Sequence, residues 1–247
     1  MAKAFITQEY LSADKQSQLR ILSVANALFE LRNCSGFEEL CRRLRMRDLR
    51  STFFELYAAK LFFEDGFDIW AQPETGTRGY DFDFQARRNA EAINVEVTAI
   101  RIERFSARTA KNALLQKRRQ LPADLPAIVF CAFPSLWLEE KDLKGELSLI
   151  CDEFFSRTQR INKVVFVYDP YITDIEDTKA AGLAFGLLTF VNPGARLTAP
   201  TLPFLHFDSR EGRTFRRASR AANVSLSDVA DRLEKPELFR WADSVLD

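Results

Sequence analysis

The chain has 247 residues, enough for one large domain or for a core with a small appendage. Hydrophobic residues make up 47% and charged residues 28%, which is ordinary globular usage and excludes a disordered or collagen-like chain. The 35 Lys and Arg residues balance the 35 Asp and Glu residues, so we expect no strong overall field that would attract nucleic acid.

The rarest residue types exclude several classes of site. A single histidine, His206, excludes chemistry that needs two imidazoles, such as that of HExxH metalloproteases. The four cysteines form no CxxC pair, which argues against structural zinc and indicates buried, reduced thiols in a cytoplasmic protein. The first residues lack an apolar leader, and no run of 18 apolar residues follows, so we expect neither secretion nor a membrane partner.

Helical periodicity predicts three helices early in the chain, over residues 14–33, 36–46 and 52–65, the last of which ends at Gly66. Strict alternation of apolar and polar residues then predicts three short strands, over residues 67–72, 80–86 and 93–100. The short connections between these strands favour an antiparallel meander.

The second half alternates helices with apolar strands. Helices are predicted over 105–120 and 137–157, and strands over 125–133, 162–169 and 183–191. One or two closing helices follow over 225–246, after an arginine-rich loop at 210–220. This order predicts an α/β fold in which a meander leads through a helical crossover to a buried strand. We divide the chain into a helical segment (1–48), an α/β core (49–195) and a tail (196–247).

Acidic residues form the constellation best suited to chemistry, since the chain has no GxGxxG, GxxxxGK[ST] or GxSxG motif. Asp81 and Asp83 alternate along one predicted strand, so both should leave the same face, opposite the aromatic residues Phe82 and Phe84. Glu96 does the same on the next strand. Three carboxylates that converge on a covered face are best compensated by a hard cation such as Mg²⁺.

Three pieces of sequence together resemble the core of the PD-(D/E)xK nuclease superfamily: a helix with Glu55, then GYDFDF at 79–84, then NVEVT at 94–98. The resemblance implies a restriction-endonuclease-like mixed sheet flanked by helices, and hydrolysis of phosphodiester bonds, with DNA as the expected substrate. It also implies an Mg²⁺ or Mn²⁺ site made by Asp81 (or Asp83), Glu96 and the Val97 carbonyl, with Glu55 assisting.

The lysine of the family's motif is replaced by Thr98 in this chain. The family tolerates a lysine supplied from the following helix, and both Lys111 and Lys117 flank the apolar stripe of the helix predicted over 105–120. Lys117 is the preferred substitute, because its stem can run along the sheet and present the ammonium to the acids. Gln116 and Gln120 are further polar candidates.

Basic residues around the acidic centre are expected to bind phosphates. The candidates lie at and after the end of the third predicted strand: Arg101, Arg104, Arg108, Arg118 and Arg119. Other interpretations stay open. Glu55 also fits a capping box with Thr52. The whole chain also fits an inactive nuclease-fold module that binds nucleic acid or a protein partner, or a structural protein without a site. A homodimer is left open as well.

Overall fold

The computed structural model describes residues 15–47, 49–73, 76–77, 81–174 and 181–205. His206, the arginine-rich segment 210–220 and the predicted closing helices at 225–246 lie outside the described residues.

Within the described residues, the strands form one six-stranded mixed sheet whose spatial order is the chain order. The strands are β1 (Asp68–Ala71), β2 (Phe84–Arg88), β3 (Glu91–Ala99), β4 (Ala127–Phe133), β5 (Ile161–Asp174) and β6 (Ala181–Val191). Strands β1, β2 and β3 form the predicted antiparallel meander. Strands β3, β4 and β5 are parallel, and β6 returns antiparallel to β5.

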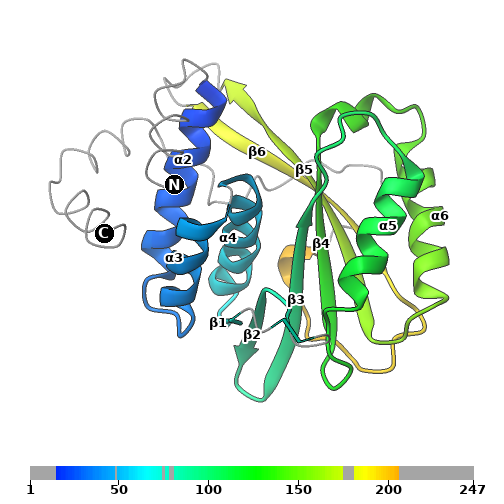
Figure 1. Ribbon diagram of the computed structural model, residues 1–247, viewed down its shortest axis with the longest axis horizontal. Helices are drawn as coiled ribbons and strands as arrows, with labels where there is room; N and C mark the ends of the chain where they lie inside the picture. Colours follow the sequence, from blue (N-terminus) through cyan, green and yellow to red (C-terminus); the bar gives the residue numbers. More distant parts are fainter. Residues whose placement is uncertain (1–14, 48, 74–75, 78–80, 175–180, 206–247) are drawn as a thin grey trace, which may run out of the picture.

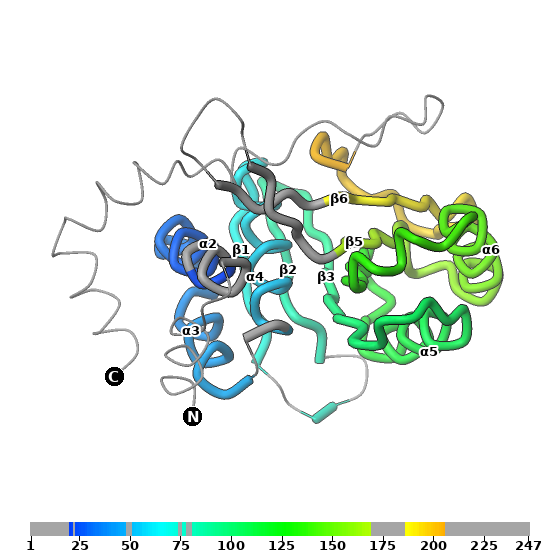
Figure 2. Tube along the Cα trace, turned by 90° about the horizontal axis from the view of Figure 1, so that it is seen from above, coloured from blue at the N-terminus to red at the C-terminus, as the bar shows by residue number. Residues whose placement is uncertain are grey.

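Helices cover both faces of this sheet, as Figures 1 and 2 show. One face carries α2 (Lys15–Leu31), α3 (Phe37–Met46) and α4 (Leu49–Glu64), and the other carries α5 (Ala107–Arg118) and α6 (Leu143–Phe155). Two short 3₁₀ helices, η1 (Ser135–Glu139) and η2 (Pro203–Leu205), complete the described elements. The predicted α/β class is therefore confirmed.

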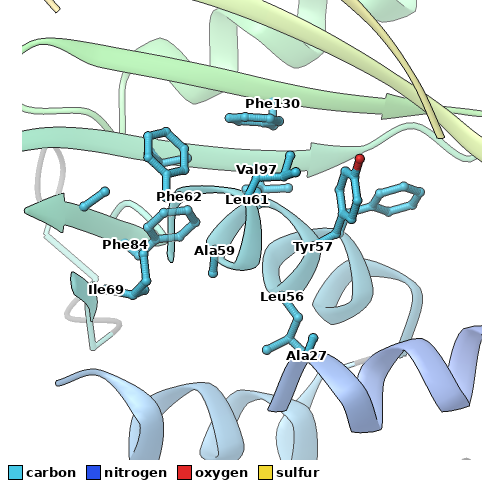
Figure 3. Close-up of a cluster of buried hydrophobic side chains, with 14 of the residues drawn as sticks. Ala27, Leu56, Tyr57, Ala59, Leu61, Phe62, Ile69, Phe84, Val97 and Phe130 are labelled. Atoms are coloured by element: carbon cyan, nitrogen blue, oxygen red, sulfur yellow. The ribbon is translucent and has the colours of Figure 1, made fainter. Parts of the chain in front are cut away.

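Strand alternation divides the apolar side chains into two cores, one on each face. On the α4 side, Phe62 makes edge-to-face contacts with Phe84 and Phe130, at 5.8 and 6.2 Å between ring centroids (Figure 3). On the α5 side, Phe133 stacks on the fully buried Trp137. Because β3 turns Val95 and Val97 toward α4, the intervening Glu96 faces α5, as the alternation predicted.

The strand predicted over 80–86 starts later than expected. Pairing of β2 with β3 begins at Phe84, opposite Val95, and Phe82 precedes the ladder. The expectation that Phe82 and Phe84 share a face is therefore wrong, since Phe82 packs into the α5-side core and Phe84 into the α4-side core. The reason is that strict alternation holds only where the chain is paired in the sheet.

The start of α3 is attached to β1, which fixes the position of the following helix. Gly36 N–H donates to the Ile69 carbonyl at 2.8 Å, and a Cβ on Gly36 would lie only 2.2 Å from the Ala71 nitrogen. Both the amide and the hydroxyl of Ser35 donate to the Asp68 carboxylate, at 3.0 and 2.6 Å. Only glycine permits this close approach of the helix start to the strand.

The described residues contain no helix with the length and apolar character that a membrane crossing requires. Cys34, Cys41, Cys131 and Cys151 are all buried and unpaired, which confirms the prediction of buried thiols. Burial raises the pKa of Cys34 and of Cys41 to about 11, so these thiols stay protonated and unreactive at neutral pH.

Candidate active site

Three buried carboxylates from three elements form what we call the acidic cluster: Glu55, Asp83 and Glu96. Glu55 lies in α4, Asp83 directly before β2, and Glu96 in β3 with only 1% of its surface exposed. Asp83 is held against β3, because the Val97 amide donates to its Oδ2 at 2.7 Å. Burial and the Asp83 charge raise the pKa of Glu96 well above its ordinary value, although Lys117 opposes the change.

Two arginines from α3 neutralise part of this cluster. Arg43, which is 1% exposed, donates through Nη1 to Glu55 Oε2 at 3.1 Å and to Asp83 Oδ1 at 3.2 Å. Arg47 donates to Glu55 Oε1 and lies 3.4 Å from Asp83 Oδ1. The other nitrogens of Arg43 bind Glu39 and the Gln72 carbonyl, so its guanidinium joins α3, α4 and the entry to β2. Such a buried ion network is tolerable only because nearly every group has a partner.

Lys117 supplies the third cation from the opposite face of the sheet. It lies in the last turn of α5, and its ammonium donates to Glu96 Oε1. Lys111, the other sequence candidate, instead pairs with Glu153 of α6 and does not reach the cluster. Burial alone would lower the pKa of Lys117, but the Glu96 and Asp83 carboxylates raise it above its ordinary value. Lys117 is therefore an ammonium at neutral pH, able to donate hydrogen bonds but not to accept a proton.

The cluster opens into a cavity of about 520 Å³. Besides the acids and their cations, the wall includes Asp81, Val97, Thr98, Arg101 and Gln120. Gln120, two residues beyond the end of α5, donates to the Asp81 carbonyl at 3.2 Å and so holds the segment that precedes β2. Carboxylates, an ammonium and an exposed guanidinium thus share one concave surface, which makes this cavity the candidate functional site.

The structure brings together most of the residues that the sequence selected. Both Asp81 and Asp83 line the cavity, but it is the Asp83 carboxylate that joins the acidic cluster. The capping-box interpretation of Glu55 is wrong, because α4 begins at Leu49 and the Glu55 side chain reaches Arg43 and Arg47. Gln116 is exposed and does not line the cavity.

The predicted phosphate-binding arginines are divided among three places. Arg101 lines the acidic cavity, whereas Arg118 and Arg119 line a second cavity beyond α5. Arg104 and Arg108 are exposed near the start of α5 and line neither cavity.

Sequence reasoning missed the roles of Arg43 and Arg47. The signal was present, since both arginines fall on the stripe that carries the buried Leu40 and Leu44 of α3, at spacings of three and four residues. An arginine on the buried face of a helix needs a buried acidic partner. The acidic residues that fill this role are Glu55 in α4 and Asp83 before β2.

Whether the acidic cluster could bind a divalent cation depends on which of its carboxylate oxygens already have hydrogen-bond partners. Among the described residues, no group of three or more Asp, Glu, His or Cys side chains is arranged to hold a metal ion. Protein donors already bind both carboxylate oxygens of Glu55 and of Asp83. Glu96 differs, because its Oε2 is buried and accepts no hydrogen bond from the residues described. This oxygen is a hard donor, and within the described residues it is the atom of the cluster best placed to bind Mg²⁺ or Mn²⁺.

Comparison with known proteins adds no identification. No protein-family model matches the chain, and the comparison with curated proteins gives no match. The acidic cluster and Lys117 are positioned by the core formed by α4, β1, β2, β3, α5 and β4.

Glu55 gives folding stability a pH dependence whose sign follows from its pKa. Burial and the Asp83 charge raise this pKa from 4.5 to about 7, so between these values the folded chain binds more protons than the unfolded chain. The free energy of unfolding should then fall as pH rises from about 5 to 7, by at most about 1.4 kcal/mol per pH unit for one proton. In Glu55→Gln, the free energy of unfolding measured with urea should depend less steeply on pH than in wild type. The same change at the exposed Glu38 should leave the slope unaltered, and an equal slope in wild type and Glu55→Gln would disprove the assignment.

Proposed function

We propose that the chain hydrolyses phosphodiester bonds of nucleic acid, with DNA as the expected substrate, in the manner of the PD-(D/E)xK nucleases that its sequence resembles. The observation that carries the proposal is the contact between the Lys117 ammonium and Glu96, beside Asp83. Lys117 thus supplies a cation to the cavity that Thr98 also lines, and Thr98 occupies the position of the motif lysine. The order of strands and helices around it supports the same proposal.

A divalent cation, Mg²⁺ or Mn²⁺, would be held first by Glu96, whose Oε2 accepts no hydrogen bond from the described residues, and then by Asp83, with Val97 beside them. When bound, such a cation polarises the scissile phosphate and lowers the pKa of a bound water. To serve as a ligand through Oδ1, Asp83 must release the N–H groups of Arg43 and Arg47. Of the two arginines, Arg47 is the partly exposed one, and its guanidinium would then be able to bind a substrate phosphate.

The remaining side chains have roles that follow from their charge. Lys117, held as an ammonium by Glu96, donates hydrogen bonds to the attacking water or to the oxygens on which negative charge develops. Arg101 is exposed on the wall of the cavity and neutralises a substrate phosphate. Glu55 acts indirectly, because its two oxygens orient Arg43 and Arg47.

Glu96→Gln tests the metal and the reaction together. The change removes one ligand charge and keeps the shape of the side chain, so Mn²⁺ binding and cleavage of a labelled DNA should both be lost while the fold is kept. The measurements are calorimetric titration with Mn²⁺, a cleavage assay with Mg²⁺ or Mn²⁺, and circular dichroism. Glu103→Gln, the same change at an exposed position outside the cavity, is the control and should behave as wild type. Unchanged Mn²⁺ affinity in Glu96→Gln would refute the metal assignment.

The second candidate is an inactive nuclease-fold module that binds nucleic acid. The observation in its favour is that Arg43 and Arg47 occupy the oxygens of Glu55 and Asp83, which lets the acids be buried without a cation. Wild-type protein that binds nucleic acid but neither binds Mn²⁺ nor cleaves would favour this module over the enzyme.

A further inference from the structure

A second cavity, of about 740 Å³, is lined by five arginines, which we call the arginine cavity: Arg118, Arg119, Arg157, Arg160 and Arg196. It lies where the C-terminal ends of α5 and α6 meet the segment after β6. No Asp or Glu is among the described residues that line it. Five like charges gather around one concave surface, so this part of the chain would attract an anion.

Two of the guanidinium groups are fixed in place by contacts between the two helix ends. Arg118, at the end of α5, donates to the Arg157 carbonyl beyond α6 at 2.7 Å. Arg160 donates in the opposite direction, to the Leu121 carbonyl beyond α5 at 3.0 Å. The Arg196 amide donates to the Gln159 carbonyl at 2.7 Å, which attaches the third segment. Each guanidinium has five N–H donors, so donors remain for a ligand after these contacts.

Helix ends explain only part of this cluster. Arginines near a helix C-terminus are favoured by the partial negative charge there, which accounts for Arg118, Arg119 and Arg157. Arg160 and Arg196 lie outside both helices and need another reason. Arg157 forms an ion pair with Glu153 at 2.6 Å, and Glu153 also forms an ion pair with Lys111. Among the residues described, the side chains of Arg119 and Arg196 bind no acceptor.

We infer that the arginine cavity binds backbone phosphates of the nucleic-acid strand that enters the acidic cavity. The two cavities border the same turn of chain, because Lys117 and Gln120 line the acidic cavity while Arg118 and Arg119 line the arginine cavity. Arginine is the side chain best suited to phosphate, since its planar fork makes two parallel hydrogen bonds. This inference rests on the proposed function, because it assumes that the bound strand continues into the acidic cavity. The inference itself concerns binding and not cleavage.

The test is the affinity of the full chain for fluorescein-labelled duplex and single-stranded DNA, measured by anisotropy in EDTA over a range of KCl concentrations. EDTA removes divalent cations, so cleavage plays no part in the result. The variant Arg119→Ala/Arg196→Ala should weaken binding by about tenfold or more at low salt. It should also flatten the slope of log K against log salt on duplex by about 0.9 for each of the two lost contacts.

Arg45→Ala is the matched control, because Arg45 is exposed on α3 and lies about 200° around the helix from Arg43. It should bind DNA as wild type does. Equal affinity and equal slope for wild type and the double variant would overturn the inference, as would an absence of DNA binding by wild type. Inorganic phosphate that stabilises wild type but not the double variant, with DNA affinity equal in both, would assign the cavity to small phosphate compounds instead and would also overturn it.

The two proposals fail separately. Loss of DNA affinity in the double variant, together with wild-type protein that never cleaves, would support the arginine cavity and refute the nuclease. Cleavage that depends on Glu96, with DNA affinity unaffected by the arginine changes, would support the nuclease and refute the arginine cavity.

Discussion

Lys117→Ala is expected to slow phosphodiester cleavage by about 10²–10⁴-fold without weakening the binding of Mn²⁺. The ammonium of Lys117 contacts Glu96 but is not itself a cation ligand, so its loss removes charge stabilisation and leaves the carboxylate oxygens in place. Single-turnover cleavage and Mn²⁺ titration measure the two effects separately. Lys111→Ala, on the same helix but paired with Glu153, is the control and should cleave as wild type does.

Moving the lysine sharpens this test. Thr98 lies two residues after Glu96 on the same face of β3 and lines the same cavity, so a lysine there would present its ammonium to the acids. Adding Thr98→Lys to Lys117→Ala should therefore restore part of the activity. Cleavage by Lys117→Ala at the wild-type rate would contradict the role of Lys117. Cleavage by Thr98→Lys alone, in the absence of wild-type activity, would identify the natural chain as the inactive module.

Arg43→Met is expected to lower the free energy of unfolding by about 3–5 kcal/mol at pH 7, the usual cost of breaking a buried ion network from one side. Methionine keeps much of the side-chain volume but leaves Glu55 and Asp83 with fewer compensating charges in a buried position. Urea unfolding measures the loss. Because the pKa of Glu55 is about 7 even with Arg43 in place, protonation should relieve the unpaired charge in acid, and the loss should be smaller at pH 5.

Two further variants separate charge from packing. Arg43→Met combined with Glu55→Gln removes one of the unpaired acids and should recover part of the lost stability. Arg45→Met, on the exposed side of α3, should change stability by no more than about 0.5 kcal/mol. A loss that is the same at pH 5 and pH 7, and that the second change does not reduce, would show that Arg43 acts through packing and not through the acids.

The alternation of apolar residues in strands and their periodicity in helices were enough to predict the fold class and part of the site from the sequence. Apolar alternation in β3 placed Glu96 and Thr98 on one face and Val95 and Val97 on the other, because successive strand residues point to opposite sides. Helical periodicity in α5 placed Lys117 beside the buried Leu114, within reach of that face. Both arguments need only the geometry of one regular element.

Tertiary structure alone decided which carboxylate joins the cluster and what neutralises it. Asp83 meets Glu55 through the shared Arg43, and its position could not be read from strand alternation, because the chain before β2 lies outside the ladder with β3. Arg43 and Arg47 reach the acids only because α3 is attached to β1 at Gly36, a contact between residues 33 positions apart. Such contacts depend on how elements far apart in the sequence pack together, and no local periodicity contains that information.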